Sequence, residues 1–208
     1  MRLILARHGN TFGPGDTPVW VGAKEDLPLV EKGEAQSTAI ADYLERTDQK
    51  PDRVIAGPLL RTRRGAEIIV AKTGFSGEIE IEERLKEIDY GSWGGCSDAE
   101  IEERYGAQVI TDWREHTIVP EGADWSPSPE TLKTNATDLL SEIIAGDEET
   151  VLLISSNGTL RYFHAAIYEG VASPPSAKVK TGHICLADWN GTTFEPIGWN
   201  IDPAATGL

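Results

Sequence analysis

Cysteine and long apolar runs are both scarce in this 208-residue chain, and each scarcity excludes a class of protein. The two cysteines, Cys96 and Cys185, are far apart and lack metal-type spacing, which excludes a disulfide framework and favours a reducing compartment. No apolar run approaches the roughly 20 residues that a membrane-spanning helix needs. The first apolar run is short and ends in Arg-His rather than at a small-residue cleavage site, so we expect a cytoplasmic protein.

Basic residues are also few. The chain has 19 Lys and Arg against 34 Asp and Glu, which gives a formal net charge of -15 at pH 7. A field of this sign repels nucleic acid and acidic membrane surfaces, so neither is expected as a partner. It also repels phosphorylated metabolites, and a site for such a molecule must therefore gather its cations locally. The stretch "LLRTRRGAE" places Arg61, Arg63 and Arg64 together, and we expect the last two to be solvated.

Apolar residues follow a strand-helix-strand-helix order along the chain. Three short apolar runs are typical of strands buried on both faces of a parallel sheet, namely 2–6, 54–56 and 151–155. Four stretches carry helical periodicity or helix-end signals: 31–46, 61–74, 129–146 and the residues after 158. A hairpin is expected around Asn190-Gly191. This order predicts an α/β fold, a three-layer α/β/α sandwich with a mostly parallel central sheet.

Residues 1–208 are expected to form a single domain, because this length suits one substantial core. Residues 96–128 fit the alternation less well, since they combine many acids with Trp113 and Trp125. We interpret them as a small cap insertion near the functional site. A surface excursion with one or two short helices is the competing interpretation.

The tripeptide Arg7-His8-Gly9 stands where the first strand should end. Ligands of open α/β sheets bind beyond the carboxyl ends of the strands. An arginine at that place can hold a phosphate with two parallel N–H donors, and a histidine can act as nucleophile, acid-base group or ligand. A glycine allows close approach of the backbone. Taken alone, the tripeptide is more typical of a structural role.

Together with further stretches of the chain, the Arg7-His8-Gly9 tripeptide resembles the motifs of the histidine phosphatase superfamily, also called the phosphoglycerate-mutase-like family. The matching stretches occur in the family's order: "RHGNT", "DLPLVEKGEAQ", "GPLLRTRRGAEII", "LKEIDYGSW" and, near the end, "KTGHICLADWN". Each motif is modest, but together they span most of the chain and are quite specific. The sequence therefore resembles a phosphoryl-transfer protein of this family.

The resemblance implies a role for each matching residue. His8 would attack phosphorus and become a phosphohistidine, while Arg7 and Arg61 would clamp the non-bridging oxygens. Glu87 would protonate the leaving oxygen and then activate water. Without the motif, nothing favours Glu87 over Glu83 or Asp89, and Asp89 is the second candidate. Further phosphate contacts are implied at Asn10, Thr11 and Gly22. No metal or cofactor is implied, because two arginines can supply the stabilising charge.

The family pattern breaks at "VLLISSNGTLR". Aligned on Gly158 and Arg161, the position of the family's second active-site histidine is Ser156, followed by Asn157, and residues 117–163 contain no histidine. Three explanations stay open. Ser156 and Asn157 replace the histidine as neutral donors, His183 of the "KTGHICL" turn fills its place, or turnover has been lost and phosphate binding kept.

These observations predict a phosphohydrolase that cleaves a small phosphomonoester through a phosphohistidine. Two alternatives are a phosphoglycerate-type mutase and a non-catalytic protein that binds a phosphorylated ligand. In each case the expected partner is a small phosphorylated metabolite. The sequence does not reveal which metabolite, and it leaves the oligomeric state open, a homo-oligomer included.

Overall fold

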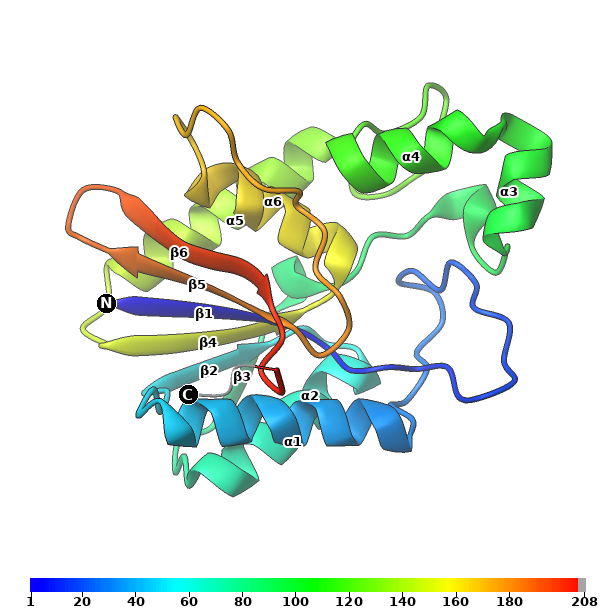
Figure 1. Cartoon of the computed structure of the whole chain (residues 1–208). Coiled ribbons are helices and arrows are strands. Elements are labelled where there is room, and N and C mark those ends of the chain that lie inside the picture. The colour runs from blue at the N-terminus through cyan, green and yellow to red at the C-terminus, as the bar shows by residue number, and fades with distance from the viewer. Residues whose placement is uncertain (206–208) are drawn as a thin grey trace.

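The computed structural model describes residues 1–205, in which six strands form one sheet. The strands are β1 Arg2–Arg7, β2 Arg53–Ala56, β3 Ile79–Ile81, β4 Thr150–Ser155, β5 Ile184–Trp189 and β6 Phe194–Ile201. The strand order is β3-β2-β4-β1-β5-β6 (Figure 1). The first four of these are parallel, whereas β5 and β6 are each antiparallel to their neighbour. The predicted mostly parallel sheet is confirmed, and β5 and β6 form the predicted hairpin.

Two pairs of helices cover the two faces of the sheet (Figure 1). The pair on one face is α1 Glu31–Arg46 and α2 Leu60–Thr73, and the pair on the other is α5 Pro129–Ile144 and α6 Asn157–Ile167. Alternate side chains of β1 point into opposite cores. Leu3 and Leu5 pack with α5 and α6, whereas Ile4 and Ala6 pack with α1 and α2. Both faces of β1 are therefore buried, which confirms the predicted three-layer sandwich.

Residues 96–128 contain two further helices, α3 Asp98–Tyr105 and α4 Ala107–His116, and we call this segment the cap. Both helices lie beyond the end of the sheet, on the side where β1 ends (Figure 1). Ser97 starts α3 with a capping box, because its side chain and that of Glu100 each accept a hydrogen bond from the other's backbone N–H. Gly106, at φ 86°, separates α3 from α4.

Aromatic side chains join the cap to the rest of the molecule. The aromatic cluster comprises Trp20, Tyr90, Trp93, Trp113 and Trp125, with ring centroids 4.9–6.3 Å apart, most of them edge to face. Two short 3-10 helices, η1 Glu83–Leu85 and η2 Gly91–Trp93, flank the segment that brings Tyr90 into this cluster.

No helix within residues 1–205 is long and apolar enough to cross a membrane.

Candidate active site

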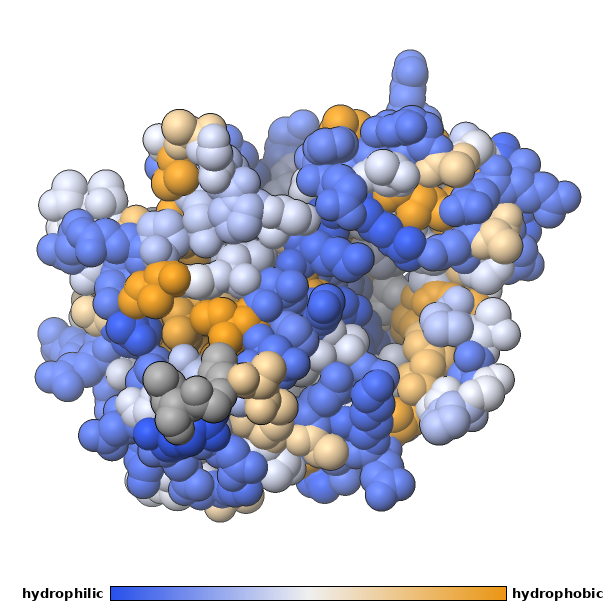
Figure 2. Space-filling model, viewed as in Figure 1, coloured by the Kyte–Doolittle hydropathy of each residue, from blue (hydrophilic) through white to orange (hydrophobic). Residues whose placement is uncertain are grey.

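A cavity of about 870 Å³ opens at the carboxyl end of β1. Figure 2 shows the surface hollowed between the sheet body and the cap side of the molecule. Eight of the ten predicted site residues line this cavity: Arg7, His8, Asn10, Thr11, Gly22, Arg61, Glu87 and Asn157. The other two, Ser156 and His183, are not part of its described lining. The fold therefore brings together residues that are up to 150 positions apart in the sequence.

His8 is held directly after β1, because its backbone N–H donates to the carbonyl of Ser155 at 3.0 Å. Its ring Nδ1 lies 2.7 Å from the carbonyl oxygen of Gly9. A carbonyl only accepts, so the proton sits on Nδ1 and Nε2 keeps a free lone pair. Burial lowers the pKa of His8 well below its usual value, and the charges of Arg7 and Arg61 lower it further. The imidazole is therefore neutral and available as a nucleophile.

Arg7 ends β1 and turns its side chain toward the segment that precedes β5. One terminal nitrogen of its guanidinium donates to the carbonyl of Val179 at 2.7 Å, while its buried Nε has no partner. Burial lowers the pKa of Arg7, and the charges of Arg61 and Arg161 act in the same direction, although an arginine stays protonated in proteins. A buried cation with an unused donor is suited to bind an anion.

Arg61 lies in the first turn of α2 and is buried. Its guanidinium donates to the carbonyls of Gly22 at 2.8 Å and Glu25 at 3.1 Å, so the loop around Gly22 is fastened to the helix. Gly22 has φ 64°, and a Cβ atom there would lie 2.9 Å from the carbonyl oxygen of Ile88. Only glycine fits this close approach of two loops.

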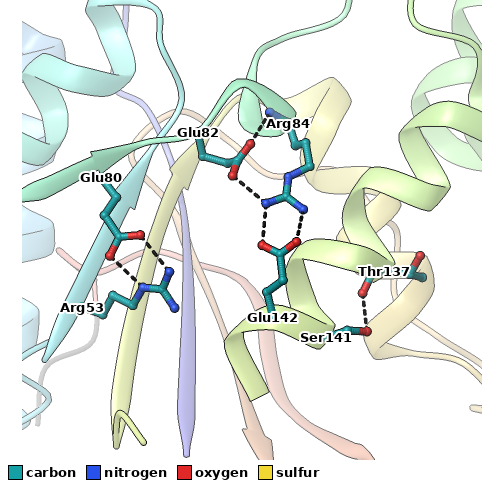
Figure 3. Close-up of polar contacts among 7 residues, drawn as sticks. All are labelled: Arg53, Glu80, Glu82, Arg84, Thr137, Ser141 and Glu142. Atoms are coloured by element: carbon teal, nitrogen blue, oxygen red, sulfur yellow. Dashed lines mark hydrogen bonds and ion pairs between the residues drawn. The ribbon is translucent and has the colours of Figure 1, made fainter. Parts of the chain in front are cut away.

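The segment that leads to Glu87 is fixed on several sides. Arg84 of η1 donates to Glu142 of α5 at 2.6 and 2.7 Å and to Glu82 at 2.7 Å (Figure 3). The hydroxyl of Ser155, at the end of β4, donates to the carbonyl of Leu85 at 2.7 Å. The hydroxyl of Thr159 on α6 donates to the carbonyl of Lys86 at 2.6 Å. These bonds hold the backbone before Glu87 against the sheet and both helices.

The carboxylate of Glu87 lies at the N-terminus of α6. Its two oxygens accept from the backbone N–H groups of Ile88 at 2.9 Å and Gly158 at 3.4 Å. A Cβ atom on Gly158 would lie 2.4 Å from Glu87 Oε1 and 2.5 Å from the hydroxyl of Tyr90. The absence of a side chain at Gly158 is therefore what lets Glu87 and Tyr90 converge there.

Asp89, the second candidate acid, is engaged elsewhere. Its carboxylate lies 3.1 Å from Lys24 Nζ and accepts from the backbone N–H of Gly91 at 2.9 Å.

A hydrogen-bond network orients Asn10. Its backbone N–H donates to Gln36 Oε1 at 2.8 Å, and its side-chain oxygen accepts from the hydroxyl of Thr181. Gln36 in turn donates to the carbonyl of Thr181 at 2.9 Å. Because the amide oxygen of Asn10 is occupied, its NH₂ group is the end left to donate to a ligand.

The two neutral replacements for the family's histidine have different surroundings. Ser156 is 0% exposed, and its Oγ has no hydrogen-bond partner. Asn157 lines the cavity, and its Oδ1 accepts from the backbone N–H of Val179 at 2.8 Å. A backbone N–H only donates, so this contact fixes the oxygen of Asn157 and leaves its NH₂ group as the free donor.

His183 lies just before β5, with its side chain away from the cavity lining. Its Nδ1 donates to the carbonyl of Asn200 at 3.1 Å, and its Nε2 is 4.0 Å from Asp202. Its backbone carbonyl accepts from the N–H of Arg7 at 3.0 Å, so the residue supports the end of β1 through its main chain. The position of His183 therefore gives no geometric support to the explanation in which it replaces the family's second active-site histidine.

Arg161 is a cavity residue that sequence reasoning used only for alignment. It is 1% exposed, and its guanidinium donates to Thr117 Oγ1 at 3.0 Å and to the carbonyl of Arg114 at 2.9 Å. The guanidinium also lies 4.9 Å from the ring centre of Trp113. The sequence feature that points to Arg161 is a lone cation among the apolar residues of "LRYFHAAI".

The cavity contains a buried histidine, two arginines and a carboxyl group. This set defines a protein suited to bind a tetrahedral oxyanion at the end of the first strand. The family model of the histidine phosphatase superfamily (branch 1) matches residues 3–202. The chain therefore belongs to this superfamily, as the motifs indicated.

Similar proteins include both mutases and phosphatases. A 2,3-bisphosphoglycerate-dependent phosphoglycerate mutase of Bifidobacterium longum is 30% identical over 122 residues, which are 57% of this chain and 48% of the relative. The match thus spans about half the length of that relative. A probable phosphoglycerate mutase of Erwinia tasmaniensis is 28% identical over 98% of this chain and 92% of its own. The solved mycobacterial glucosyl-3-phosphoglycerate phosphatase is 21% identical with a TM-score of 0.78, over 97% of this chain and 99% of that one, which shows the shared fold.

Proposed function

We propose that the protein is a phosphohydrolase that cleaves a small phosphomonoester through a phosphohistidine on His8. The observation that carries this proposal is the neutral, Nδ1-protonated imidazole of His8, which shares one cavity with Arg7, Arg61 and Glu87. This set supplies a nucleophile, a positive clamp and an acid, which are the parts that phosphoryl transfer needs.

In the first step, Nε2 of His8 bonds to phosphorus as the bond to the leaving oxygen breaks. The carboxyl group of Glu87 gives its proton to that oxygen, and the alcohol departs. In the second step, the Glu87 carboxylate takes a proton from water while the water oxygen attacks phosphorus, which frees His8 and orthophosphate. Arg7 and Arg61 stabilise the charge on the equatorial oxygens in both steps, so the mechanism needs neither metal nor cofactor.

Asn157 is the better replacement for the second histidine, because it lines the cavity and its NH₂ group is free. A neutral donor stabilises a phosphoryl oxygen less than a charged one does, so catalysis is reduced rather than abolished. Asn10 and Thr11 follow His8 in the chain. Both line the cavity and add polar groups to it.

Trapping the covalent intermediate tests the mechanism. The enzyme is mixed briefly with p-nitrophenyl phosphate, quenched in alkali and digested for mass spectrometry. We expect phosphate on His8 in the wild type and in the control His183→Ala, whose side chain lies outside the cavity, and none in His8→Ala. Full turnover by His8→Ala, or a turning-over enzyme without phosphate on His8, would overturn the proposal.

The names of the two curated relatives favour a phosphoglycerate mutase as a second candidate. A mutase must keep its phosphohistidine from water until the intermediate is rephosphorylated. Phosphorus NMR of the enzyme with 3-phosphoglycerate separates the two functions. We expect orthophosphate, and accumulation of 2-phosphoglycerate without orthophosphate would replace the hydrolase with the mutase.

A further inference from the structure

The loop between β1 and α1 gives the cavity an apolar side, which we call the apolar wall. It consists of the apolar residues of this loop that line the cavity: Phe12, Pro18, Val19, Trp20 and Val21. In Figure 2, orange and tan atoms follow the side of the hollow on which the blue loop of Figure 1 lies. The only charged residue within 12–21 is Asp16, whose negative charge disfavours an anion on this side.

Three side chains of the apolar wall have no part in the protein interior. Phe12, Val19 and Val21 are half-buried, and within residues 1–205 none of them packs in or against the two apolar cores. Apolar surface inside a cavity is covered favourably by an apolar group of a ligand, because both surfaces then leave water. The apolar wall is therefore suited to bind such a group.

The apolar wall is fixed at Trp20 by bonds to the start of the cap. The backbone N–H of Trp20 donates to the carbonyl of Cys96 at 2.9 Å, and its carbonyl accepts from the N–H of Gly95 at 2.9 Å. Its indole Nε1 donates to Asp98 at 2.9 Å. Because these bonds exist before a ligand arrives, little binding free energy is spent on ordering this part of the wall.

The apolar wall adjoins the proposed acid. The ring of Trp20 meets the ring of Tyr90 edge to face, with the centroids 5.0 Å apart. The hydroxyl of Tyr90 and the carboxylate of Glu87 converge on Gly158, as a Cβ atom there would contact both. In an ester that is cleaved at His8 with Glu87 as the acid, the alcohol part therefore lies where it can meet the wall.

The cavity has room for a sizeable alcohol beside the phosphoryl group. Its volume of about 870 Å³ lies in the range of roughly 300–1,000 Å³ that is typical of sites for drug-sized ligands. The Arg and Lys residues of its described lining all lie outside the wall: Arg7, Arg61, Arg114, Arg161 and Lys178. Charge and apolar surface thus come from different elements of the cavity.

We propose that the apolar wall binds the alcohol part of the substrate, so that the substrates are phosphomonoesters of an alkyl or aryl alcohol rather than of a polar one. This inference rests on the proposed function, because it assigns the alcohol of the cleaved ester to the wall. It makes Phe12 and Val19 specificity-determining residues.

Alkylphosphonates test the inference on the wild-type protein, because they keep the anion and the chain but have no ester bond to hydrolyse. Calorimetry gives the dissociation constants of ethyl-, butyl- and hexylphosphonate, and competition with orthophosphate shows whether they bind in the cavity. Each methylene that the wall covers should tighten binding about fourfold. We expect hexylphosphonate to bind at least about tenfold more tightly than ethylphosphonate. A smaller gain, or binding that orthophosphate does not displace, would overturn the inference.

A matched pair of ligands separates an apolar from a polar alcohol. Butylphosphonate and 3-hydroxypropylphosphonate have chains of equal length, which end in a methyl group and a hydroxyl group. A hydroxyl against the wall loses its hydrogen bonds to water, so butylphosphonate should bind more tightly by about fourfold or more. A smaller difference, or preference for the hydroxylated ligand, contradicts the inference.

Substitution then assigns the preference to the wall. In Phe12→Ala and Val19→Thr, the hexyl-to-ethyl preference should fall by about threefold or more, both in dissociation constants and in kcat/KM for the two alkyl phosphates. Val171→Thr repeats the valine change at a side chain that is 42% exposed and outside the described lining, so its preference should match the wild type. A purely structural effect weakens both ligands alike, so an unchanged preference in Phe12→Ala and Val19→Thr counts against the inference.

The phosphonates keep the two proposals separate. If hexylphosphonate is preferred and orthophosphate displaces it, but no ester is hydrolysed, the proposed hydrolysis fails and the apolar site stands. If p-nitrophenyl phosphate is hydrolysed but the phosphonate series is flat, the apolar site fails and the hydrolase stands. Should Phe12→Ala fail to fold, the wild-type series and Val19→Thr still decide.

Discussion

The side-chain oxygen of Asn157 accepts a hydrogen bond from the backbone N–H of Val179 at 2.8 Å. The carbonyl of the same Val179 accepts one from Arg7 at 2.7 Å. One residue of the segment before β5 therefore orients both the arginine that ends β1 and the amide that starts α6. Since the oxygen of Asn157 is occupied, its NH₂ group is the end available to a phosphoryl oxygen.

Asn157→Asp should lower kcat/KM for p-nitrophenyl phosphate by more than tenfold. The aspartate keeps the acceptor for Val179, but it replaces an N–H donor, worth about 0.5–1.5 kcal/mol, with a negative charge that repels phosphate. Asn157→Ala lacks that repulsion and should lose less, about 3- to 10-fold. Steady-state kinetics measure both changes. Wild-type kinetics in Asn157→Asp would show that the amide does not serve the phosphate.

Ser156→Ala should keep its activity and unfold no more easily than the wild type. The Ser156 hydroxyl is buried without a partner, and it makes no capping hydrogen bond to α6. Removing an unsatisfied hydroxyl is neutral or stabilising, here by up to about 1 kcal/mol. Urea unfolding and kinetics test this prediction, and a large loss of kcat would instead identify Ser156 as the replacement for the histidine.

Glu87→Gln should accumulate the phosphoenzyme when the substrate is p-nitrophenyl phosphate. Nitrophenolate leaves without being protonated, so the first step survives, whereas water still needs a base in the second, whose loss costs about 10²- to 10⁴-fold. A stopped-flow burst of one equivalent of nitrophenol should therefore precede slow turnover. The matched control is Asp89→Asn, whose carboxylate pairs with Lys24, and it should show no such burst. A burst in that control alone would exchange the two roles.

The His8 ring should stay neutral, with its proton on Nδ1, in mildly acidic solution. Burial and two arginines lower its pKa well below the usual value, and the carbonyl of Gly9 fixes the tautomer. Nitrogen-15 NMR of the imidazoles distinguishes this state at pH 5.5, where free histidine in the same buffer is largely protonated and provides the reference. A doubly protonated His8 ring at that pH would contradict the expectation.

The stability of the protein should fall as the pH drops below about 6.5, the ordinary value for histidine. Burial lowers the pKa of His164 to about 4, so between these values the unfolded chain binds a proton that the folded chain does not. Protonation therefore favours unfolding in that window, and His8 acts in the same direction.

His164→Phe isolates this contribution. The phenyl ring can keep the stacking on Tyr168 and the edge-to-face contact with Trp199 while removing the titrating group and the unpartnered Nε2. Relative to wild type, the variant should gain stability as the pH is lowered from 7.5 to 4.5. Urea unfolding across this range measures the difference, and parallel curves for the two proteins would contradict the prediction.

The sequence was most informative where a local pattern has a single structural meaning. Buried runs at β1, β2 and β4 and the amphipathic patterns of α1, α2 and α5 predict the alternating layers, because burial on two faces or on one stripe follows directly from residue order. The sequence carries no signal for the three residues of β3, since a strand that short at a sheet edge leaves no periodic pattern. It does not specify the helices of the cap, because residues 96–128 are too acidic for a clear apolar stripe.

The sequence by itself determined that Arg7 and His8 lie at the end of a buried strand and that Arg61 lies at the start of a helix. It also determined that Glu87 belongs to the stretch "LKEIDYGSW". The tertiary structure alone decided which neighbours of these residues reach the cavity. Ser156 and Asn157 are adjacent in the chain, yet only Asn157 lines the cavity, because the side chains of consecutive residues at a helix start point in different directions. Likewise, Arg161 became a cavity residue because α6 packs beneath the cap, a long-range contact that no local pattern encodes.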